Sequence, residues 1–341
     1  MEENNNRNGI LSGGNWIVDH IKLIEVYPEE ERLANIQMEI TSNGGAPYNL
    51  LVTLHKMQTN IPLEGIGVIG DDENGKLILE ECLSMAIDTE QIRKIPDAST
   101  SYTDVMTVRS TGRRTFFHFR GANALLDQNH FDFSRTRAKI FHFGYLLLLD
   151  RMDDVDENGN TGASETLKRA KKNGLLTSID VVSEQSDRYR EIIPPALPYV
   201  DYLFLNEFEI EMLTGICILD EQGEVKAEKG YQAAGELLDL GVLKWVIIHF
   251  RKGAIAVHKT GEKRYQKGVC FPTNEIKGTV GAGDAFAAGV LAGLHENWSM
   301  DRCLISGVSV AASSLRDVTS TGSIGNWEDC MDLGNSYGWY S

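Results

Sequence analysis

Short runs of β-branched and aromatic residues alternate with helix-like segments along most of this chain, and this alternation limits the possible fold more than any other feature. Strands are predicted at 63–69, 138–143, 175–181, 202–205 and 245–249. Helices are predicted at 75–86, 164–173, 207–213 and 231–240. Strands that alternate with helices form a mostly parallel sheet covered on both faces, and such sheets bind ligands beyond the carboxyl ends of their strands. The sequence therefore predicts a three-layer α/β fold.

One region departs from this rhythm. Residues 101–119 form two runs of alternating polarity around Ser110, Thr111 and Gly112, a pattern typical of a β-hairpin. A hairpin inside an α/β chain predicts a small β appendage, to which the segment 21–40 could add strands. We therefore expect residues 1–341 to form one α/β domain, with a β-strand lid built from about 21–40 and 99–120.

The charge balance limits the possible partners. The chain has 33 Lys and Arg residues against 49 Asp and Glu residues, a formal net charge of −16. Nucleic acids and anionic membranes require a concentrated basic surface, so neither is an expected partner. A small anion is still possible, because a few backbone donors can hold a phosphate.

The cysteines and the N-terminal residues predict the compartment. Five cysteines without a CxxC pair suggest reduced structural thiols. The polar segment 1–8 lacks the apolar core of a signal peptide, and the apolar run 145–149 is too short to span a bilayer. We therefore expect a cytoplasmic protein.

A glycine motif at 65–70 matches the G-x-G-x-x-G pattern of dinucleotide-binding folds. Its context does not fit, because Asp71, Asp72 and Glu73 follow at once and would repel a pyrophosphate. We interpret the motif as a strand that ends in a tight turn.

The strongest chemical signal is the segment 278–286, GTVGAGDAF, which precedes a small-residue helical pattern at 287–294. Gly281, Ala282 and Gly283 would open this helix, and their backbone N–H groups could converge on one anion. Asp284 would lie beside that anion as a general base for a hydroxyl attacking a phosphoryl group. On these residues alone, Asp284 could equally be an ordinary first-turn helix residue.

Several motifs together decide between these interpretations. Five segments resemble motifs of the ribokinase (pfkB-type) superfamily of carbohydrate kinases, and they follow one another in the family's order. Along the chain these are the N-terminal glycine pair with Asn at 43–49, the G-x-x-G-D-D-x-x-G segment at 67–75, the end of the lid at 120–123, the N-x-x-E motif at 206–209 and the C-terminal signature at 281–284. The resemblance covers about residues 13–325.

The resemblance implies ATP-dependent phosphorylation of a sugar-like alcohol. Asp284 would be the base, and the amides of Gly281, Ala282 and Gly283 would stabilise charge on the transferred phosphoryl group. Asn206 and Glu209 would order Mg²⁺, with Glu209 acting through water. Gly253 would contribute to the nucleotide site.

The resemblance also implies an acceptor site. Asp19, at the end of a probable first strand over 15–19, would bind sugar hydroxyls together with Asn15. Gly44 and Gly45 would let the backbone approach the sugar, and Asn49 would add a polar contact. Taken alone, the glycine pair could be a simple turn.

The lid would close over the sugar and exclude water. Arg120 could contact a carboxylate or phosphate of the substrate or the transferred phosphoryl group, or could be a surface residue. Asn123, at the end of the lid, is expected to bind the sugar as well. Arg109, Arg113 and Arg114 are interpreted as solvated residues at the hairpin tip. Lids in this family also serve as dimer interfaces, so a homodimer is expected.

Three departures from the family pattern affect the cofactors. Gly278 replaces an Asp that helps to order a monovalent cation, which puts potassium activation in doubt. The segment 248–253 keeps only Gly253 of the usual nucleotide loop, so the nucleotide contacts are expected to differ from those of the family. The helix 306–314 has Gly307 and Ser309 where Asn-Ala-Ala is usual.

The predicted function is that of a sugar or sugar-acid kinase of the fructose, ribose or 2-keto-3-deoxygluconate type. A nucleoside kinase and a non-catalytic sugar-binding regulator on the same fold are the alternatives. The sequence does not identify the sugar, because lid side chains determine substrate choice.

Overall fold

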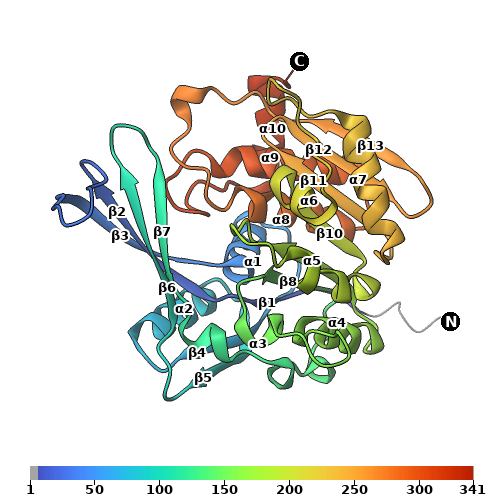
Figure 1. The fold of residues 1–341 in the computed structure, drawn as a ribbon, viewed down its shortest axis with the longest axis horizontal. Coiled ribbons are helices and arrows are strands. Elements are labelled where there is room, and N and C mark those ends of the chain that lie inside the picture. Colours follow the sequence, from blue (N-terminus) through green and yellow to red (C-terminus); the bar gives the residue numbers. More distant parts are fainter. Residues whose placement is uncertain (1–6, 341) are drawn as a thin grey trace.

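The computed structural model describes residues 7–340 and contains two β-sheets (Figure 1). The larger has nine strands in the order β13-β12-β11-β10-β9-β8-β1-β4-β5, and the smaller has four in the order β3-β2-β6-β7. Residues 1–6 of the polar N-terminal segment lie outside the described residues.

The larger sheet is parallel from β5 to β11 and antiparallel at β12 and β13. Its strands are β1 (Ile10–Gly14), β4 (Leu63–Gly70), β5 (Asp88–Ile95), β8 (Ile140–Leu146), β9 (Leu176–Val181), β10 (Tyr202–Asn206), β11 (Trp245–Phe250), β12 (Gly253–His258) and β13 (Lys263–Lys267). Its central strands are buried on both faces, which explains why they appear in the sequence as continuous apolar runs.

Helices cover both faces of this sheet, and each face has its own apolar core. One core includes residues of α1 (Ala46–Lys56), α2 (Glu73–Ser84), α8 (Ala282–His295), α9 (Met300–Ser314) and α10 (Trp327–Tyr337). The other includes residues of α3 (Asp150–Asp153), α4 (Gly162–Lys172), α5 (Tyr189–Ile192), α6 (Glu207–Thr214) and α7 (Ala227–Asp239). The predicted three-layer α/β fold is therefore confirmed.

The N-terminal strand is the main error in the sequence prediction. A single strand was expected over 15–19, but β1 ends at Gly14 and a second strand, β2 (Ile17–Ile24), begins three residues later. Gly14 has a φ of 128° and a Cβ there would lie 1.8 Å from the Gly144 carbonyl oxygen, so the chain turns between the two sheets at a glycine. Asp19 consequently belongs to the smaller sheet.

The smaller sheet forms the lid, which projects from the body of the molecule (Figure 1). It consists of β2, β3 (Ile36–Gly44), β6 (Ser101–Val108) and β7 (Arg114–Phe119), with β2 and β6 parallel at its centre. The hairpin predicted around Gly112 is present. The first lid segment is longer than the predicted 21–40, because both of its strands extend down to the larger sheet.

The glycine motif at 65–70 ends a strand, as the charges after it indicate. Asp72 caps α2 by accepting a hydrogen bond from the Gly75 N–H (2.9 Å) and another from the Thr100 hydroxyl (2.6 Å). Asp72 therefore stabilises the turn between β4 and α2.

No helix within residues 7–340 combines the length and apolar character needed to cross a membrane. The five cysteines are free thiols, three of them buried.

Candidate active site

A cavity of about 770 Å³ opens at the carboxyl ends of β9, β10 and β11, where parallel sheets bind ligands. The N-terminal end of α8 forms another part of its wall. The cavity brings together the predicted residues Asp284, Gly281, Ala282, Gly283, Asn206, Glu209 and Gly253.

Asp284 lies in the first turn of α8 and is only 4% exposed. The Asn49 amide donates to one of its carboxylate oxygens (2.8 Å), and the Tyr145 hydroxyl lies 2.8 and 2.7 Å from the two oxygens. Two donors from different elements, α1 and β8, therefore fix the orientation of this carboxylate. Asn49 was expected to contact the sugar, and it binds Asp284 in this structure.

Burial raises the pKa of Asp284 to about 6, although the hydrogen bonds from Tyr145 and Asn49 favour the charged form. A carboxyl group with a pKa near neutrality suits a general base, because it is ionised at neutral pH and can still accept a proton during the reaction.

Two further carboxylates line the same cavity. Asp180, on β9, is 4% exposed, and burial followed by the charges of Asp284 and Glu209 raises its pKa well above the ordinary value. Burial also raises the pKa of Glu209 to about 7. Three carboxyl groups thus share one buried wall, and a cation bound there would favour their ionised forms. Asp180 was missed in the sequence, although an aspartate inside an apolar strand is itself a signal.

Asn206 and Glu209 form a reciprocal cap at the start of α6. The Asn206 side chain accepts from the Glu209 N–H (2.9 Å), and Glu209 accepts from the Asn206 N–H (2.8 Å) and from the Asn206 amide (2.9 Å). Ser183 also donates to Glu209 (2.7 Å). The N-x-x-E motif therefore has a structural role, because it holds this carboxylate at the cavity wall.

Among residues 7–340, no cluster of three or more His, Cys, Asp or Glu side chains is arranged to hold a metal ion by itself. The carboxyl groups of Asp180 and Glu209 still fit Mg²⁺, because this ion retains waters and is bound through one or two carboxylates together with substrate phosphates.

The start of α8 has the features expected of an anion site. Gly281 precedes the helix with φ 78°, and a Cβ there would lie 2.5 Å from the Ser320 Cβ. The Ala282 N–H lies 3.4 Å from the Thr279 carbonyl oxygen. Among the described residues, the Gly283 and Asp284 N–H groups bond to no backbone carbonyl, as expected for a first helical turn. These two amides are the best placed to receive an anion.

His249 replaces part of the usual nucleotide loop and lies beside this turn. A Cβ on Gly283 would be 3.2 Å from its ring, which also packs against Phe286. Burial lowers the pKa of His249 to about 4, so the ring is neutral at physiological pH. Gly253 begins β12, where a Cβ would lie 2.3 Å from the Gln266 carbonyl oxygen.

Asp19 faces the site from the lid. Burial raises its pKa to about 7, with Asp284 acting in the same direction, while Thr103 and Arg114 act in the opposite direction. A Cβ on Gly44 would lie 2.4 Å from an Asp19 carboxylate oxygen, so this glycine makes room for the carboxylate. Gly45 has φ 88°, and a Cβ there would lie 1.8 Å from the Asn15 carbonyl oxygen.

Asn15 and Asn123 are fully buried and support the backbone around the site. Asn15 accepts from the Tyr145 N–H (2.5 Å) and donates to the Leu148 carbonyl (3.1 Å). Asn123 donates to the Trp16 carbonyl (3.0 Å). Both residues thus position the backbone in this structure, and their contact with the sugar stays a prediction.

Arg120 is engaged with protein carboxylates. Its guanidinium lies 3.0 Å from Asp150 and 3.8 Å from Glu184, which follow β8 and β9 respectively. In this structure Arg120 therefore links the end of the lid to two loops of the larger sheet.

Arg114 corrects a sequence interpretation, because it is not a solvated residue of the hairpin tip. It begins β7 on the same lid face as Asp19, is half-buried, and donates to the Val318 carbonyl (3.3 Å). A Cβ on Gly278 would lie 2.8 Å from its guanidinium. Glycine at position 278 thus leaves space for the arginine, whose partner is distant in sequence and could not be anticipated.

Comparison with known proteins places these features in a family. Residues 15–328 match the pfkB family of carbohydrate kinases. The chain is 24% identical over 320 residues to a ribokinase of Haemophilus influenzae, covering 94% of this chain and 96% of that one. It is 27% identical over 269 residues to a probable chloroplastic fructokinase of Arabidopsis thaliana, covering 75% and 63%. An Arabidopsis thaliana ribokinase complexed with ribose and ATP has the same fold, with a TM-score of 0.75, 22% identity and coverage of 96% and 98%.

Proposed function

The chain belongs to the pfkB family of carbohydrate kinases, and we propose that it transfers the terminal phosphoryl group of ATP to a hydroxyl group of a small sugar or sugar acid. Its family makes it a phosphotransferase with an alcohol acceptor. The observation that carries the finer proposal is the placement of Asp284. Its carboxylate is buried in the wall of the main cavity, where Tyr145 and Asn49 hold it by hydrogen bonds.

Asp284 acts as the general base. It takes the proton of the acceptor hydroxyl as that oxygen attacks the phosphoryl group, and its pKa of about 6 keeps it ionised at neutral pH. The free N–H groups at the start of α8 stabilise the charge on the phosphoryl oxygens, because they are oriented before the reaction begins.

ATP is the proposed phosphoryl donor, held in the main cavity near Gly253 and Gly283. Asp180 and Glu209 would hold Mg²⁺, which when bound would supply positive charge beside the phosphates. The position of Gly278 beside Arg114 supports a reaction that does not depend on potassium, since a guanidinium already lies there.

The acceptor occupies the space between Asp19 and Asp284. The Asp19 carboxylate accepts hydrogen bonds from sugar hydroxyls, and Gly44 lets the backbone approach them. Fructose, ribose and 2-keto-3-deoxygluconate are the candidate acceptors, which agrees with the ribokinase and fructokinase among the relatives.

The test is a coupled assay of ADP release with fructose, ribose, 2-keto-3-deoxygluconate and adenosine. We expect turnover with at least one sugar, and a loss of roughly 10²- to 10⁴-fold in the Asp284→Asn variant because the base is removed. Full activity of Asp284→Asn would refute the assignment of the base. Tight sugar binding without turnover would favour a regulator, and a preference for adenosine would favour a nucleoside kinase.

We also propose that two copies associate through the lid, in the cytoplasm. Both faces of the lid expose large apolar side chains: Met38 and Phe116, each 53% exposed, lie on one face, and Phe117, 50% exposed, lies on the other. Exposed apolar surface of this kind is typical of an interaction site. Analytical ultracentrifugation should show a dimer, and Phe116→Ser should shift it toward monomer. A monomeric wild-type chain would refute this proposal.

A further inference from the structure

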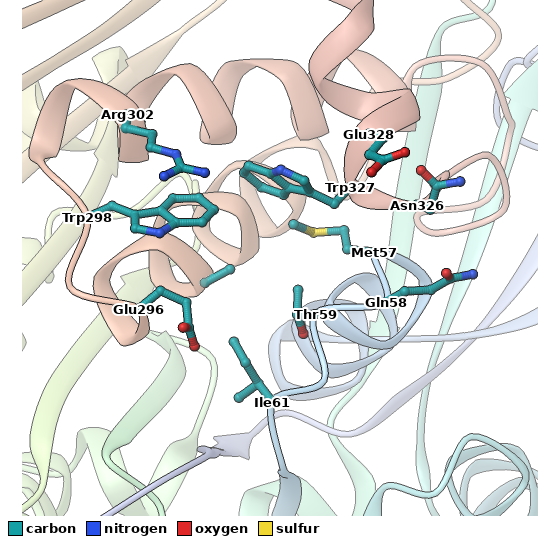
Figure 2. A pocket seen from close by; sticks show the side chains of 11 residues that line it. Met57, Gln58, Thr59, Ile61, Glu296, Trp298, Arg302, Asn326, Trp327 and Glu328 are labelled. Carbon is teal, nitrogen blue, oxygen red and sulfur yellow. The ribbon is translucent and has the colours of Figure 1, made fainter.

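A second cavity, of about 520 Å³, lies outside the candidate active site and shares no lining residue with the main cavity (Figure 2). Three parts of the chain form it: the connection after α1, the stretch from the last turns of α8 to the first turn of α9, and the start of α10. Its volume suits a small organic molecule.

Two tryptophans form one wall of this cavity. The rings of Trp298 and Trp327 lie 4.9 Å apart at 57°, and both are partly exposed (Figure 2). Arg302 stacks on the Trp298 ring at 3.7 Å, and Gly293 leaves room for that ring, since a Cβ would lie 2.9 Å from it. Met57 and Ile61 complete the apolar surface. The wall is thus a fixed aromatic platform.

The polar groups at the rim include both donors and acceptors that the protein leaves free. Asn326 and one oxygen of Glu296 are engaged, with Asp329 and His295 respectively. Within residues 7–340, the side chains of Gln58, Arg302 and Glu328 form no hydrogen bond or ion pair with another protein group, although they line the cavity (Figure 2).

This combination defines the class of ligand. A hydroxylated ring has an apolar C–H face that can pack on an aromatic ring, and hydroxyl groups that both donate and accept hydrogen bonds. Phosphorylated ligands are disfavoured, because the lining has two carboxylates and one guanidinium. We propose that this cavity is a second binding site for a neutral hydroxylated ring compound, a mono- or disaccharide, and that its occupation alters turnover.

The position of the cavity provides the connection to catalysis. Met57 follows α1, which carries Asn49, and Glu296 follows α8, which carries Asp284. Ala292 of α8 lines the cavity and lies eight residues after Asp284, which is roughly 12 Å along the helix. A ligand here would lie at the C-terminal ends of α1 and α8. Near their N-terminal ends, the same two helices are joined by the hydrogen bond between Asn49 and Asp284.

The test measures binding first, by calorimetry with trehalose and methyl α-D-glucopyranoside on the full chain. Wild type should bind at least one of them, and Gln58→Asn combined with Glu328→Ala should weaken binding roughly tenfold or more. Asn is chosen because Gln58 has φ 56°, which asparagine tolerates. Glu80→Ala, an exposed carboxylate on α2, is the matched control and should bind as wild type does.

Asp19→Asn separates this cavity from the proposed acceptor site. If binding is lost in Asp19→Asn and kept in the double variant, or if choline binds more tightly than either sugar, the assigned site or ligand class is overturned. Absence of binding by both sugars also overturns it. In the turnover assay, which alone depends on the proposed function, the bound sugar should change the rate of wild type and leave the double variant unaffected. An unchanged wild-type rate overturns the connection to catalysis.

Discussion

Replacing Tyr145 with phenylalanine should move the pH dependence of turnover as well as its rate. The Tyr145 hydroxyl lies within 2.8 Å of both oxygens of Asp284, whereas the Asn49 amide bonds to one of them, so the substitution removes a contact that reaches the whole carboxylate. A hydrogen bond to a charged group contributes about 1.5–3 kcal/mol, and about 1.36 kcal/mol changes a pKa by one. The pKa of Asp284 should therefore rise from about 6 to about 7–8.

The direction follows from which form of Asp284 loses stabilisation. The hydroxyl favours the ionised carboxylate, so its removal favours the protonated acid, and the base is lost at a higher pH than before. At pH 7 the ionised fraction should fall from about 90% to about 10–50%, a two- to ninefold loss of kcat, and most of it should return by pH 9.

The assay is the pH profile of kcat between about pH 5 and 9, with Tyr337→Phe as the matched control. Tyr337 also donates to a carboxylate, Glu275 (3.0 Å), but on the surface of α10, so its profile should match wild type. A Tyr145→Phe enzyme that is slower by the same factor at every pH would refute the reasoning, because Tyr145 would then only orient the base.

Three further predictions concern the lid, the acidic wall and a glycine. Arg114→Met should raise the pKa of Asp19 above about 7, so the KM for the acceptor should increase at pH 7 and recover at higher pH. The control Arg113→Met, at an exposed position, should leave both the pKa of Asp19 and the KM unchanged. A KM that does not vary with pH in Arg114→Met would contradict the role of Arg114. Asp180→Asn should raise the melting temperature of the ligand-free chain at neutral pH, because the buried carboxyl group has a raised pKa and its protonation on folding costs free energy that Asn does not cost. The same variant should raise the KM for MgATP, and a lower melting temperature together with an unchanged KM would argue against both roles. Gly45→Ala should lower the free energy of unfolding by several kcal/mol, because φ is 88° and the new Cβ would clash with the Asn15 carbonyl oxygen. Gly159→Ala, where φ is 78° and no atom lies within 4 Å, should lower it by about 1 kcal/mol in urea unfolding. Equal losses for the two glycines would mean that the close contact is relieved elsewhere.

The sequence predicted those parts of the fold that local patterns determine. The strands β4, β9 and β11 begin or end within about a residue of expectation, because buried parallel strands produce continuous apolar runs. Asp284 could be placed in the first turn of α8 because glycine and small residues mark that helix start. The break between β1 and β2 could not be predicted, since it depends on how Gly14 approaches Gly144 in another strand.

The candidate site shows the same limit. Tyr145 and Asp180 follow no motif, and only the pairing of β8 with β9 brings them to Asp284. Conversely, Asn15 and Asn123 resemble ligand-binding residues in the sequence because they are polar near motifs, yet their amides are engaged by backbone carbonyls. Which partner a side chain meets is a long-range property, and spacing along the chain does not contain it.

The strand order of the lid has a consequence for how the chain folds. The central pair, β2 and β6, joins residues 17–24 to residues 101–108, with β4, α2 and β5 synthesised between them. During synthesis, β2 and β3 can pair as a hairpin early, but the lid sheet cannot close until residue 119 has left the ribosome. Contacts so distant in sequence form slowly, so the apolar lid strands wait as an exposed two-stranded ribbon. The lid strands are thus exposed to chaperones, proteases and other nascent chains for longer than strands that pair only with their neighbours in sequence.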